Sequence, residues 1–377
     1  MENSEALLDL EKTGDQWSPL LDTASYFYDL PDELIAQTPA DQRDCSRLMC
    51  LRRSSGGEGA GETSRRIFKD LPGLLRRGDL LVMNDTRVFK ARLTGRKLSA
   101  QSNDGALCEI FCLSQVARSL WNALVRPGRK LAVGSRVELL NETGESSGII
   151  ISIGDRLDDG LRLIHMPNGA DVSALFDKYG RVPLPPYIKN RGVPDERYQT
   201  VYSDAQNARS AAAPTAGLHF TGSLMDELAA AGIEHTFITL DVGLGTFRPV
   251  KERDIRAHKM HTERCRIGEG SAELINSAKK DSRRVIAVGT TVTRTLESMT
   301  DEGGVVRSGA ADTDIFIYPG YRFKAIDALI TNFHLPCSTL LMLVAAFAGY
   351  DATMAAYAEA VREQYRFFSF GDAMLIE

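Results

Sequence analysis

The residues with the clearest chemical potential lie in a short segment near the C-terminus. Between Thr331 and Gly349, the sequence TNFHLPCSTLLMLVAAFAG places Asn332, His334 and Ser338 between an expected buried strand and an almost wholly apolar helix. Ser338 is a typical N-cap for that helix and Gly349 a typical stop. The amide groups at the helix start would face the loop, which suits an anion or a polar substrate. The alternative is that the polar side chains only satisfy turn backbone groups.

The same arrangement recurs at three other points. Asp241 ends an expected strand, and Thr290 and Thr291 open an expected helix. Another expected helix is preceded by Thr215, Gly217 and His219. Turn chemistry explains one such loop more easily than four. We therefore expect the loops to converge on one site at the carboxyl ends of strands.

Familiar cofactor and metal motifs do not account for these residues. The sequence Gly243-x-Gly245 lacks the third glycine and the following helix of a dinucleotide fingerprint, and the chain has no Walker loop and no serine nucleophile elbow. One group of potential metal ligands has a spacing that fits no zinc motif and comprises His258, His261, Glu263 and Cys265. We expect no metal and no prosthetic group; the alternative is a metal bound by this group.

The elements that hold these residues follow two different sequence patterns. Short β-rich runs separated by turns predict a small antiparallel barrel, with strands at Leu107–Val116, Leu120–Val125, Ser135–Leu140, Gly148–Ile153 and Gly160–Met166. From about residue 205, strands alternate with helices, which predicts an α/β layer. Its expected elements are a helix at Gly222–Ala231 capped by Thr221, strands at Ile233–Val242, Arg284–Val288, Ile315–Tyr318 and Asp327–Thr331, and a helix ending near Met299.

The predicted fold class is therefore α/β, with a mixed-sheet main domain and a small inserted antiparallel β-barrel. We expect the main domain to comprise residues 23–87 and 167–377 and the barrel residues 88–166. Residues 1–22 form an acidic extension without periodicity, and Ser54–Ser64 is a glycine-rich loop. Both segments are expected to be mobile.

Composition indicates a cytoplasmic protein with free thiols. The longest apolar run near the C-terminus, Leu340–Ala348, is too short to cross a bilayer, and the acidic N-terminus is unlike a signal peptide. The net charge of −5 means that a nucleic acid would have to bind a local basic patch. Two segments are rich in Lys and Arg, Arg87–Lys97 and Arg248–Arg266. The alternative is that both are merely solvated surfaces.

Several runs resemble the bacterial family of S-adenosylmethionine:tRNA ribosyltransferase-isomerases, which acts in queuosine biosynthesis. They are YDLPDELIAQTP (28–39), SRLM (46–49), GDLLVMNDTRV (78–88), RVPLPPYI (181–188), ERYQTVY (196–202), AAPTAGLHFT (212–221), VGLGTFRPV (242–250), HKMHTE (258–263), VGTTVTRTLES (288–298), TNFHLP (331–336) and YRFFSFGDAMLI (365–376). The resemblance runs in order from about Tyr26 to the end. Three positions depart from the family pattern: the acidic extension, Asp241 in place of a common His, and Val292 in place of Ser.

The resemblance implies transfer and isomerisation of the ribosyl moiety of S-adenosylmethionine onto the 7-aminomethyl-7-deazaguanine base of a tRNA anticodon. The product is epoxyqueuosine, and adenine and methionine are released. S-adenosylmethionine would be a consumed co-substrate, with no prosthetic group, no membrane partner and a monomer favoured. Two competing classes are a non-catalytic RNA-binding protein with this fold and a methyltransferase that binds the same nucleotide.

The resemblance also implies roles for individual residues. The catalytic candidates are His219 and His334, with Asp241 and Glu263 as orienting or proton-accepting carboxylates. The substrate-binding candidates are Asp85, Arg87, Thr215, Gly217, Phe247, Arg248, Thr290, Thr291, Arg294, Asn332 and Phe333. The tRNA-binding candidates are Lys251, Arg253, His258 and Lys259. For Phe333 the alternative is a core position, and for Arg87 and Arg294 it is structural ion pairing.

Overall fold

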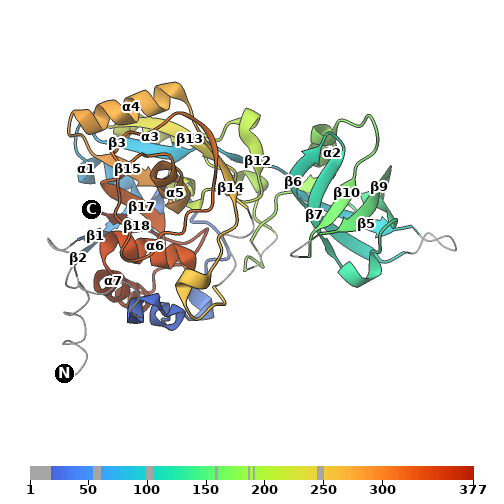
Figure 1. Ribbon diagram of the computed structural model, residues 1–377, viewed down its shortest axis with the longest axis horizontal. Coiled ribbons are helices and arrows are strands. Elements are labelled where there is room, and N and C mark those ends of the chain that lie inside the picture. The colour runs from blue at the N-terminus through green and yellow to red at the C-terminus, as the bar shows by residue number, and fades with distance from the viewer. Residues whose placement is uncertain are drawn as a thin grey trace.

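Two units make up the described chain in this computed structural model, a layered α/β unit and a β-barrel beside it (Figure 1). The structure describes residues 18–53, 61–98, 105–157, 160–185, 187–189, 192–243 and 250–377. The expectations for residues 1–17, for 54–60 of the glycine-rich loop, and for the substrate-binding candidates Phe247 and Arg248 lie outside these ranges.

The α/β unit is built on a nine-stranded mixed sheet. Across the sheet the strands are, in order, β16 (Gly309–Thr313), β14 (Glu263–Ile267), β13 (Glu234–Leu240), β3 (Leu80–Asn84), β15 (Val285–Val288), β17 (Ala328–Asn332), β18 (Ala373–Ile376), β1 (Arg47–Arg52) and β2 (Glu62–Ile67). The central strands β13, β3, β15 and β17 are parallel to one another. Their carboxyl ends therefore meet at one edge, which carries Asp241, Thr290 and Asn332.

Both faces of this sheet are covered because successive residues of a strand point to opposite sides. In β3, Leu80 and Val82 pack into one apolar core, while Leu81 and Met83 pack into another. The helices that contribute to the first core are α4 (Glu269–Lys280), α5 (Thr290–Ser298), α6 (Thr339–Ala348) and α7 (Tyr350–Arg362). Those that contribute to the second are α1 (Leu71–Leu74) and α3 (Gly222–Ala230). The result is a three-layered arrangement.

The helix boundaries follow the capping chemistry that the sequence predicted. The hydroxyl of Ser338 accepts a hydrogen bond from the backbone N–H of Leu341, and α6 ends at Gly349, whose φ of 91° favours glycine. The hydroxyl of Thr221 caps α3 in the same way, accepting from Leu224 N. Both predicted caps are confirmed, so the loops before these helices have defined conformations.

The second unit is a closed six-stranded antiparallel barrel. Around the ring its strands are β5 (Arg92–Lys97), β6 (Leu107–Ala117), β7 (Leu120–Arg126), β10 (Arg162–His165), β9 (Ser146–Arg156) and β8 (Arg136–Leu140), which pairs back with β5. A two-residue strand, β11 (Gly180–Arg181), extends the sheet beside β5, and α2 (Val172–Tyr179) adds Leu175 and Phe176 to the barrel core. The predicted fold class is confirmed; the domain boundaries stay a prediction.

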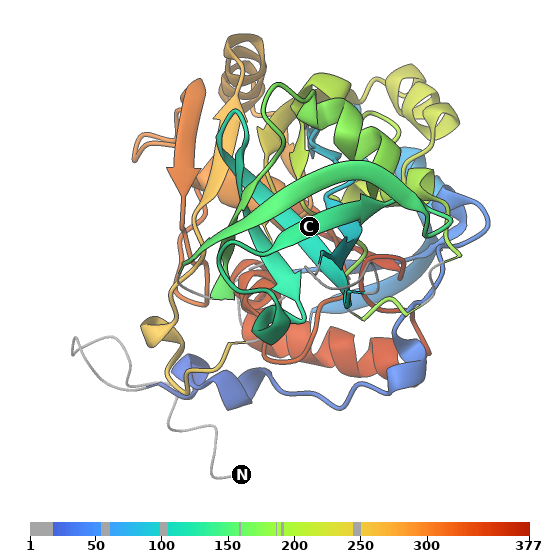
Figure 2. The same ribbon diagram turned by 90° about the vertical axis from the view of Figure 1, so that its right-hand side faces the viewer.

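A narrow connection joins the two units. The short strands β4 (Arg87–Val88) and β12 (Ala208–Ser210) pair in parallel between the sheet and the barrel. Figure 2 views the molecule from the barrel side, with the α/β unit behind it. The remaining elements are short 3-10 helices: η1 (Pro19–Leu21), η2 (Thr23–Tyr26), η3 (Asp32–Leu34), η4 (Arg43–Cys45), η5 (Phe68–Asp70), η6 (Gly128–Lys130), η8 (Asp195–Tyr198), η9 (Ala205–Asn207), η10 (Thr215–His219) and η12 (Ile255–Ala257).

Three expectations about local structure were wrong. The segment Ile315–Tyr318 is not a strand; the strand is β16, and the carbonyl of Ile315 accepts a hydrogen bond from the Arg294 side chain instead of a neighbouring strand. Glu62–Ser64, expected in the glycine-rich loop, belongs to β2. Asp22, expected in the acidic extension, is buried and caps η2 through its carboxylate.

Closure of the barrel depends on the absence of a side chain at Gly95 in β5. A Cβ atom there would lie 2.4 Å from Cγ1 of Val137 and 2.9 Å from the carbonyl oxygen of Glu138. We expect Gly95→Ala to lower the free energy of unfolding by roughly 1–3 kcal/mol through overpacking. Urea denaturation followed by tryptophan fluorescence would measure this. Gly128→Ala is the matched control, since a Cβ at Gly128 meets no atom within 4 Å; equal midpoints for both variants would contradict the prediction.

Candidate active site

A small cavity lies at the carboxyl edge of the central strands. Its volume is about 60 Å³, and six predicted site residues line it: Thr215, Thr290, Thr291, Asn332, Phe333 and His334. Small-molecule sites usually measure about 300–1,000 Å³. In this conformation the cavity can therefore hold only a fragment of a nucleotide ligand.

The positive end of the α5 dipole lies at the wall of this cavity. Gly289, Thr290 and Thr291 all contribute to the lining, and no side chain caps the helix. Gly289 has φ 100°, a conformation that glycine adopts without strain and that turns the chain from β15 into the helix. Backbone amides and two hydroxyls at a helix N-terminus form a favourable environment for an anionic or hydroxyl-rich group.

A relay of hydrogen bonds fixes the Asn332 amide. Its Nδ2 donates to the carbonyl of Phe368 at 3.0 Å, and also contacts Nε2 of His219 at 3.2 Å. Nε2 therefore accepts, and Nδ1 of His219 carries the ring proton toward the Ser46 hydroxyl at 2.6 Å. Ser46 in turn donates to the carbonyl of Arg43 at 3.2 Å. The Oδ1 atom of Asn332 is buried without a hydrogen-bond partner in the described structure.

His219 itself is enclosed. It lines neither the small cavity nor the larger cleft described below, and its ring stacks on Phe68 with centroids 4.9 Å apart. Burial lowers the pKa of His219 to about 4, so the ring is neutral at pH 7. Its observed contacts orient Asn332, whereas a role in proton transfer stays a prediction.

His334 is also buried, but it lines the cavity. Its Nε2 lies 2.9 Å from the hydroxyl of Thr331, its backbone N–H donates to the Tyr357 hydroxyl at 3.0 Å, and its carbonyl accepts from the Tyr28 hydroxyl. Burial lowers the pKa of His334 to about 3. The imidazole is therefore neutral, and the hydrogen bonds that its backbone N–H and carbonyl form with two tyrosine hydroxyls hold the residue in place.

Three other predicted residues serve mainly to support the site. Phe333 is fully buried and its ring packs against three aromatic rings, although it also touches the cavity. Gly217 is buried where a Cβ would lie 2.1 Å from the Tyr202 hydroxyl oxygen. The Asp85 carboxylate accepts from Thr239 at 2.7 Å, and burial raises its pKa. Gly217 and Asp85 line neither space.

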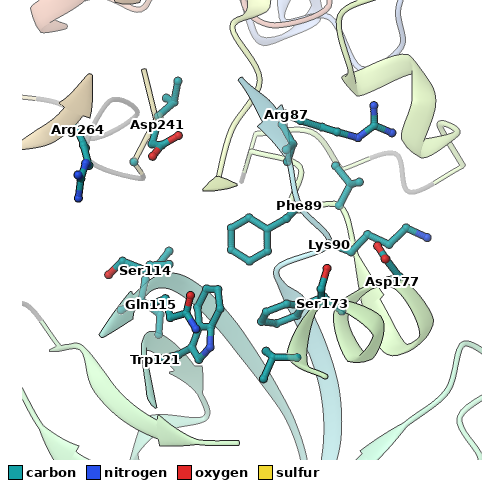
Figure 3. A pocket seen from close by; sticks show the side chains of 18 of the residues that line it. Arg87, Phe89, Lys90, Ser114, Gln115, Trp121, Ser173, Asp177, Asp241 and Arg264 are labelled. Carbon is teal, nitrogen blue, oxygen red and sulfur yellow. The ribbon is translucent and has the colours of Figure 1, made fainter. Parts of the chain in front are cut away.

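A much larger cleft separates the α/β unit from the barrel. It has a volume of about 1160 Å³ and adjoins the small cavity at Val242, which lines both. Figure 3 shows Asp241 and Arg264 on one side of the cleft and Trp121 on the other. Arg87 also lies in this lining and donates to the Ser203 hydroxyl at 3.1 Å. Of the described catalytic and substrate-binding candidates, six line the cavity and three line the cleft. The other four line neither space: His219, Asp85, Gly217 and Arg294.

The two carboxylates predicted to be catalytic, Asp241 and Glu263, both line this cleft. Asp241 follows β13 directly, and its Oδ1 accepts from the Thr86 hydroxyl at 3.4 Å. Glu263 is buried, forms a close ion pair with Arg294, and accepts from the backbone N–H of Gly243 at 2.9 Å. Glu263 is therefore fixed in position by Arg294 and Gly243.

The predicted tRNA-binding residues lie in and around η12. Lys251 and Lys259 are exposed. Arg253 pairs with Asp22 at 3.0 Å yet keeps 81% of its side chain exposed, and His258 pairs with Glu252. The four remain candidates for an RNA surface.

The metal alternative finds no support in the geometry. Across the described ranges no group of three or more His, Cys, Asp or Glu side chains is arranged to hold a metal ion. Glu263 is paired with Arg294, and the Cys265 thiol donates to the carbonyl of Ala311.

No single helix in the described ranges is long and apolar enough to span a membrane. Only the bent pair α6 and α7 would qualify together, by length and composition.

Sequence reasoning missed the aromatic side of the cleft. Phe89, Trp121 and Phe176 line it, and their rings contact one another. In the sequence they look like ordinary core residues of strands and a helix. Ser46 belongs to the SRLM run (46–49), but nothing in that run indicates contact with His219.

Comparisons with known proteins extend over nearly the whole chain. The model of a family described as "Queuosine biosynthesis protein" matches residues 23–376. A protein from Symbiobacterium thermophilum, named S-adenosylmethionine:tRNA ribosyltransferase-isomerase, is 51% identical over 354 residues, which cover 94% of this chain and 99% of that protein. A protein of the same name from Acetivibrio thermocellus is 48% identical over 354 residues, with the same coverage.

A solved structure gives a similar result. The crystal structure of an S-adenosylmethionine tRNA ribosyltransferase from Thermotoga maritima is 35% identical to this chain, with a TM-score of 0.51. The match covers 94% of this chain and 100% of the other.

The buried histidines predict a pH-dependent stability. Because the pKa of His219 is depressed to about 4, the unfolded chain binds a proton below about pH 6.5 that the folded ring does not take up. The contribution of the neutral His219 ring to the free energy of unfolding is fully present above pH 6.5. It declines as the pH falls toward 4, by up to about 1.4 kcal/mol per pH unit. We expect His219→Gln to flatten that decline in urea titrations between pH 7 and 4.5.

The matched control is His235→Gln, because His235 is exposed. It should leave the pH dependence as in the parent protein. A decline of equal steepness in His219→Gln and the parent would show that burial of this ring does not have the expected consequence.

Proposed function

This chain belongs to the family of queuosine biosynthesis proteins, and from that premise we propose that it converts tRNA to epoxyqueuosine-tRNA. It transfers and isomerises the ribosyl moiety of S-adenosylmethionine onto the 7-aminomethyl-7-deazaguanine base and releases adenine and methionine. The observation that carries the proposal is a family match that runs from residue 23 to 376, through both structural units and every segment around the cavity and the cleft.

The chemistry sets four requirements for the site. The positive sulfur of S-adenosylmethionine acidifies the adjacent C5′ hydrogens, so a positioned base can remove one of them. Adenine leaves more easily when a proton reaches its ring, and the aminomethyl nitrogen attacks only when it is uncharged. The reaction also requires shelter from water that would intercept a strained intermediate.

The small cavity and the α5 end supply groups that suit S-adenosylmethionine. Thr290 and Thr291 offer hydroxyls to the ribose or amides to the methionine carboxylate. Asn332, whose Oδ1 has no partner in the described structure, offers an acceptor. Arg294 has a buried Nη2 that is likewise unpartnered there, which makes it a second candidate for the carboxylate.

Proton transfer is assigned by position. Asp241 lies in the cleft beside Val242, where the cleft adjoins the cavity, and is our candidate for the base that deprotonates C5′ or the aminomethyl group. Glu263 orients Arg294 through their ion pair. His334, neutral and on the cavity wall, offers a hydrogen bond to adenine rather than a full charge. S-adenosylmethionine is the co-substrate, and the proposed reaction uses no metal or prosthetic group.

The first test is of reaction type. Purified protein with S-adenosylmethionine and precursor-modified tRNA should release adenine and methionine in equal amounts and form epoxyqueuosine, also in the presence of a chelator. Asp241→Asn should lower turnover by roughly 10²-fold or more, because an amide cannot accept the proton. Release of S-adenosylhomocysteine would identify a methyltransferase, and no release from any tRNA would leave only RNA binding; either result refutes the proposal.

The second test concerns the RNA surface around η12. The triple variant Lys251→Gln, Arg253→Gln, Lys259→Gln should bind tRNA more weakly and reduce the salt dependence of log Kd by about 0.7–0.9 per lost phosphate contact. S-adenosylmethionine should bind as before. The control removes three exposed positive charges elsewhere, at Arg52, Lys69 and Arg307. An identical salt slope in the two triple variants would move the RNA surface to another part of the molecule, with Arg87–Lys97 tested next.

A further inference from the structure

The cleft between the α/β unit and the barrel is larger than one co-substrate needs. At about 1160 Å³ it exceeds the usual range of small-molecule sites, about 300–1,000 Å³. The proposed reaction brings two substrates together, and the groups that suit S-adenosylmethionine lie in and beside the small cavity. The adjoining cleft therefore has room for the second substrate, a nucleobase of tRNA.

The barrel side of the cleft carries an aromatic platform. Trp121 in β7 is half-buried, with its ring centroid 5.0 Å from that of Phe176 and 5.6 Å from that of Phe89. Both partners are buried, so they fix the indole from the side while it still lines the cleft. Figure 3 shows Trp121 and Phe89 in this lining. A rigid indole on a cleft wall is a surface on which a base can stack.

The indole also carries an unused donor. Nε1 of Trp121 is buried and has no hydrogen-bond partner in the part of the chain that the structure describes. A buried indole N–H normally finds a partner. Next to it, Gln115 is the cross-strand neighbour of Trp121, and its own amide donates to the carbonyl of Arg118. An acceptor on a bound nucleotide would satisfy the indole.

The charges of the lining discriminate between parts of a nucleotide. Among the described lining residues seven are acidic and four are basic; the acidic ones are Asp171, Asp177, Asp195, Glu196, Asp241, Glu263 and Asp312, and the basic ones are Arg87, Lys90, Arg118 and Arg264. Lys90 is paired with Asp195 at 3.8 Å, and Glu263 is paired with Arg294, which lies outside the lining, so the remaining groups still carry an acidic excess. An acidic lining repels phosphate and favours a cation. A base with an aminomethyl substituent is cationic when its amine is protonated.

We propose that Trp121 is the stacking platform for the aminomethylated base of tRNA, which enters the cleft out of the anticodon stack. The indole N–H donates to that nucleotide, and the acidic lining attracts the ammonium group, from which a carboxylate then takes the proton. This assignment rests on the proposed function and adds the residue that holds the second substrate. Enzymes that act on a base within RNA commonly extrude it and read it by stacking.

The test uses a labelled anticodon stem-loop RNA in two forms, one carrying the aminomethylated base and one abasic at that position. Trp121→Ala should raise the Kd for the modified RNA by roughly 5- to 150-fold, measured by fluorescence anisotropy at fixed salt. Trp121→Phe keeps an aromatic face and should retain most of the affinity. For the abasic RNA, Trp121→Ala and the parent protein should bind equally, since the stacking partner is gone.

Two controls separate stacking from a damaged barrel. Val133→Ala removes an exposed apolar side chain of the barrel that does not line the cleft, and should leave every Kd unchanged. Binding of S-adenosylmethionine should be equal in all variants. The KM for tRNA should rise in Trp121→Ala while the KM for S-adenosylmethionine stays constant.

Each contrary outcome has a distinct meaning. An unchanged Kd in Trp121→Ala, an equal loss in Trp121→Phe, or a loss that persists with the abasic RNA would overturn the inference while the release of adenine and methionine still supports the proposed function. If the parent protein neither binds the modified RNA nor releases adenine, both fail together.

Discussion

A buried ion pair between Arg294 and Glu263 ties the two halves of the site together. Only 2% and 4% of the two side chains are exposed, so the pair lost most of its hydration on folding, and such a loss is offset only by precise additional hydrogen bonds. The structure provides them: Glu263 accepts from the backbone of Gly243, and Arg294 donates to the carbonyl of Ile315. Helix α5 on the cavity side, strand β14 on the cleft side and the chain after β13 and β16 are therefore linked through two side chains.

This ion pair connects the predicted residues that line the cavity with those that line the cleft. Hydroxyl and amide groups line the cavity, whereas carboxylates and aromatic rings line the cleft. Val242 borders both. In the proposed function, the small cavity at the N-terminus of α5 takes the partly anionic methionine end of one substrate, and the broad acidic cleft takes a base that carries an amine. The division follows from topology, because parallel strands end at one edge while the barrel faces that edge from outside.

Much of this architecture could be predicted from the sequence, since caps, turns and strand periodicity are local. Ser338, Thr221 and the convergence of strand-end loops are examples. The direction in which each side chain points could not be predicted, because it is set by neighbours distant in the chain. His219 precedes a helix just as predicted, yet Ser46 and Asn332 enclose its ring. Strand β5 was not predicted, because its segment was read only as basic residues. Trp121 is recognisable as part of the cleft wall only when its contacts with Phe89 and Phe176 are known.

The order of the nine-stranded sheet also determines how the protein behaves beside its own copies. A sheet that does not close has two outer strands whose backbone groups can recruit a strand from another molecule. Here one outer strand, β2, carries exposed charges along its length, including Glu62, Arg65 and Arg66, and Arg65 is bound to Glu359 of α7. The other, β16, is only five residues long and carries Asp312. A strand from another molecule would have to dehydrate these charges in order to pair with either outer strand. The charges therefore oppose edge-to-edge aggregation of the sheet.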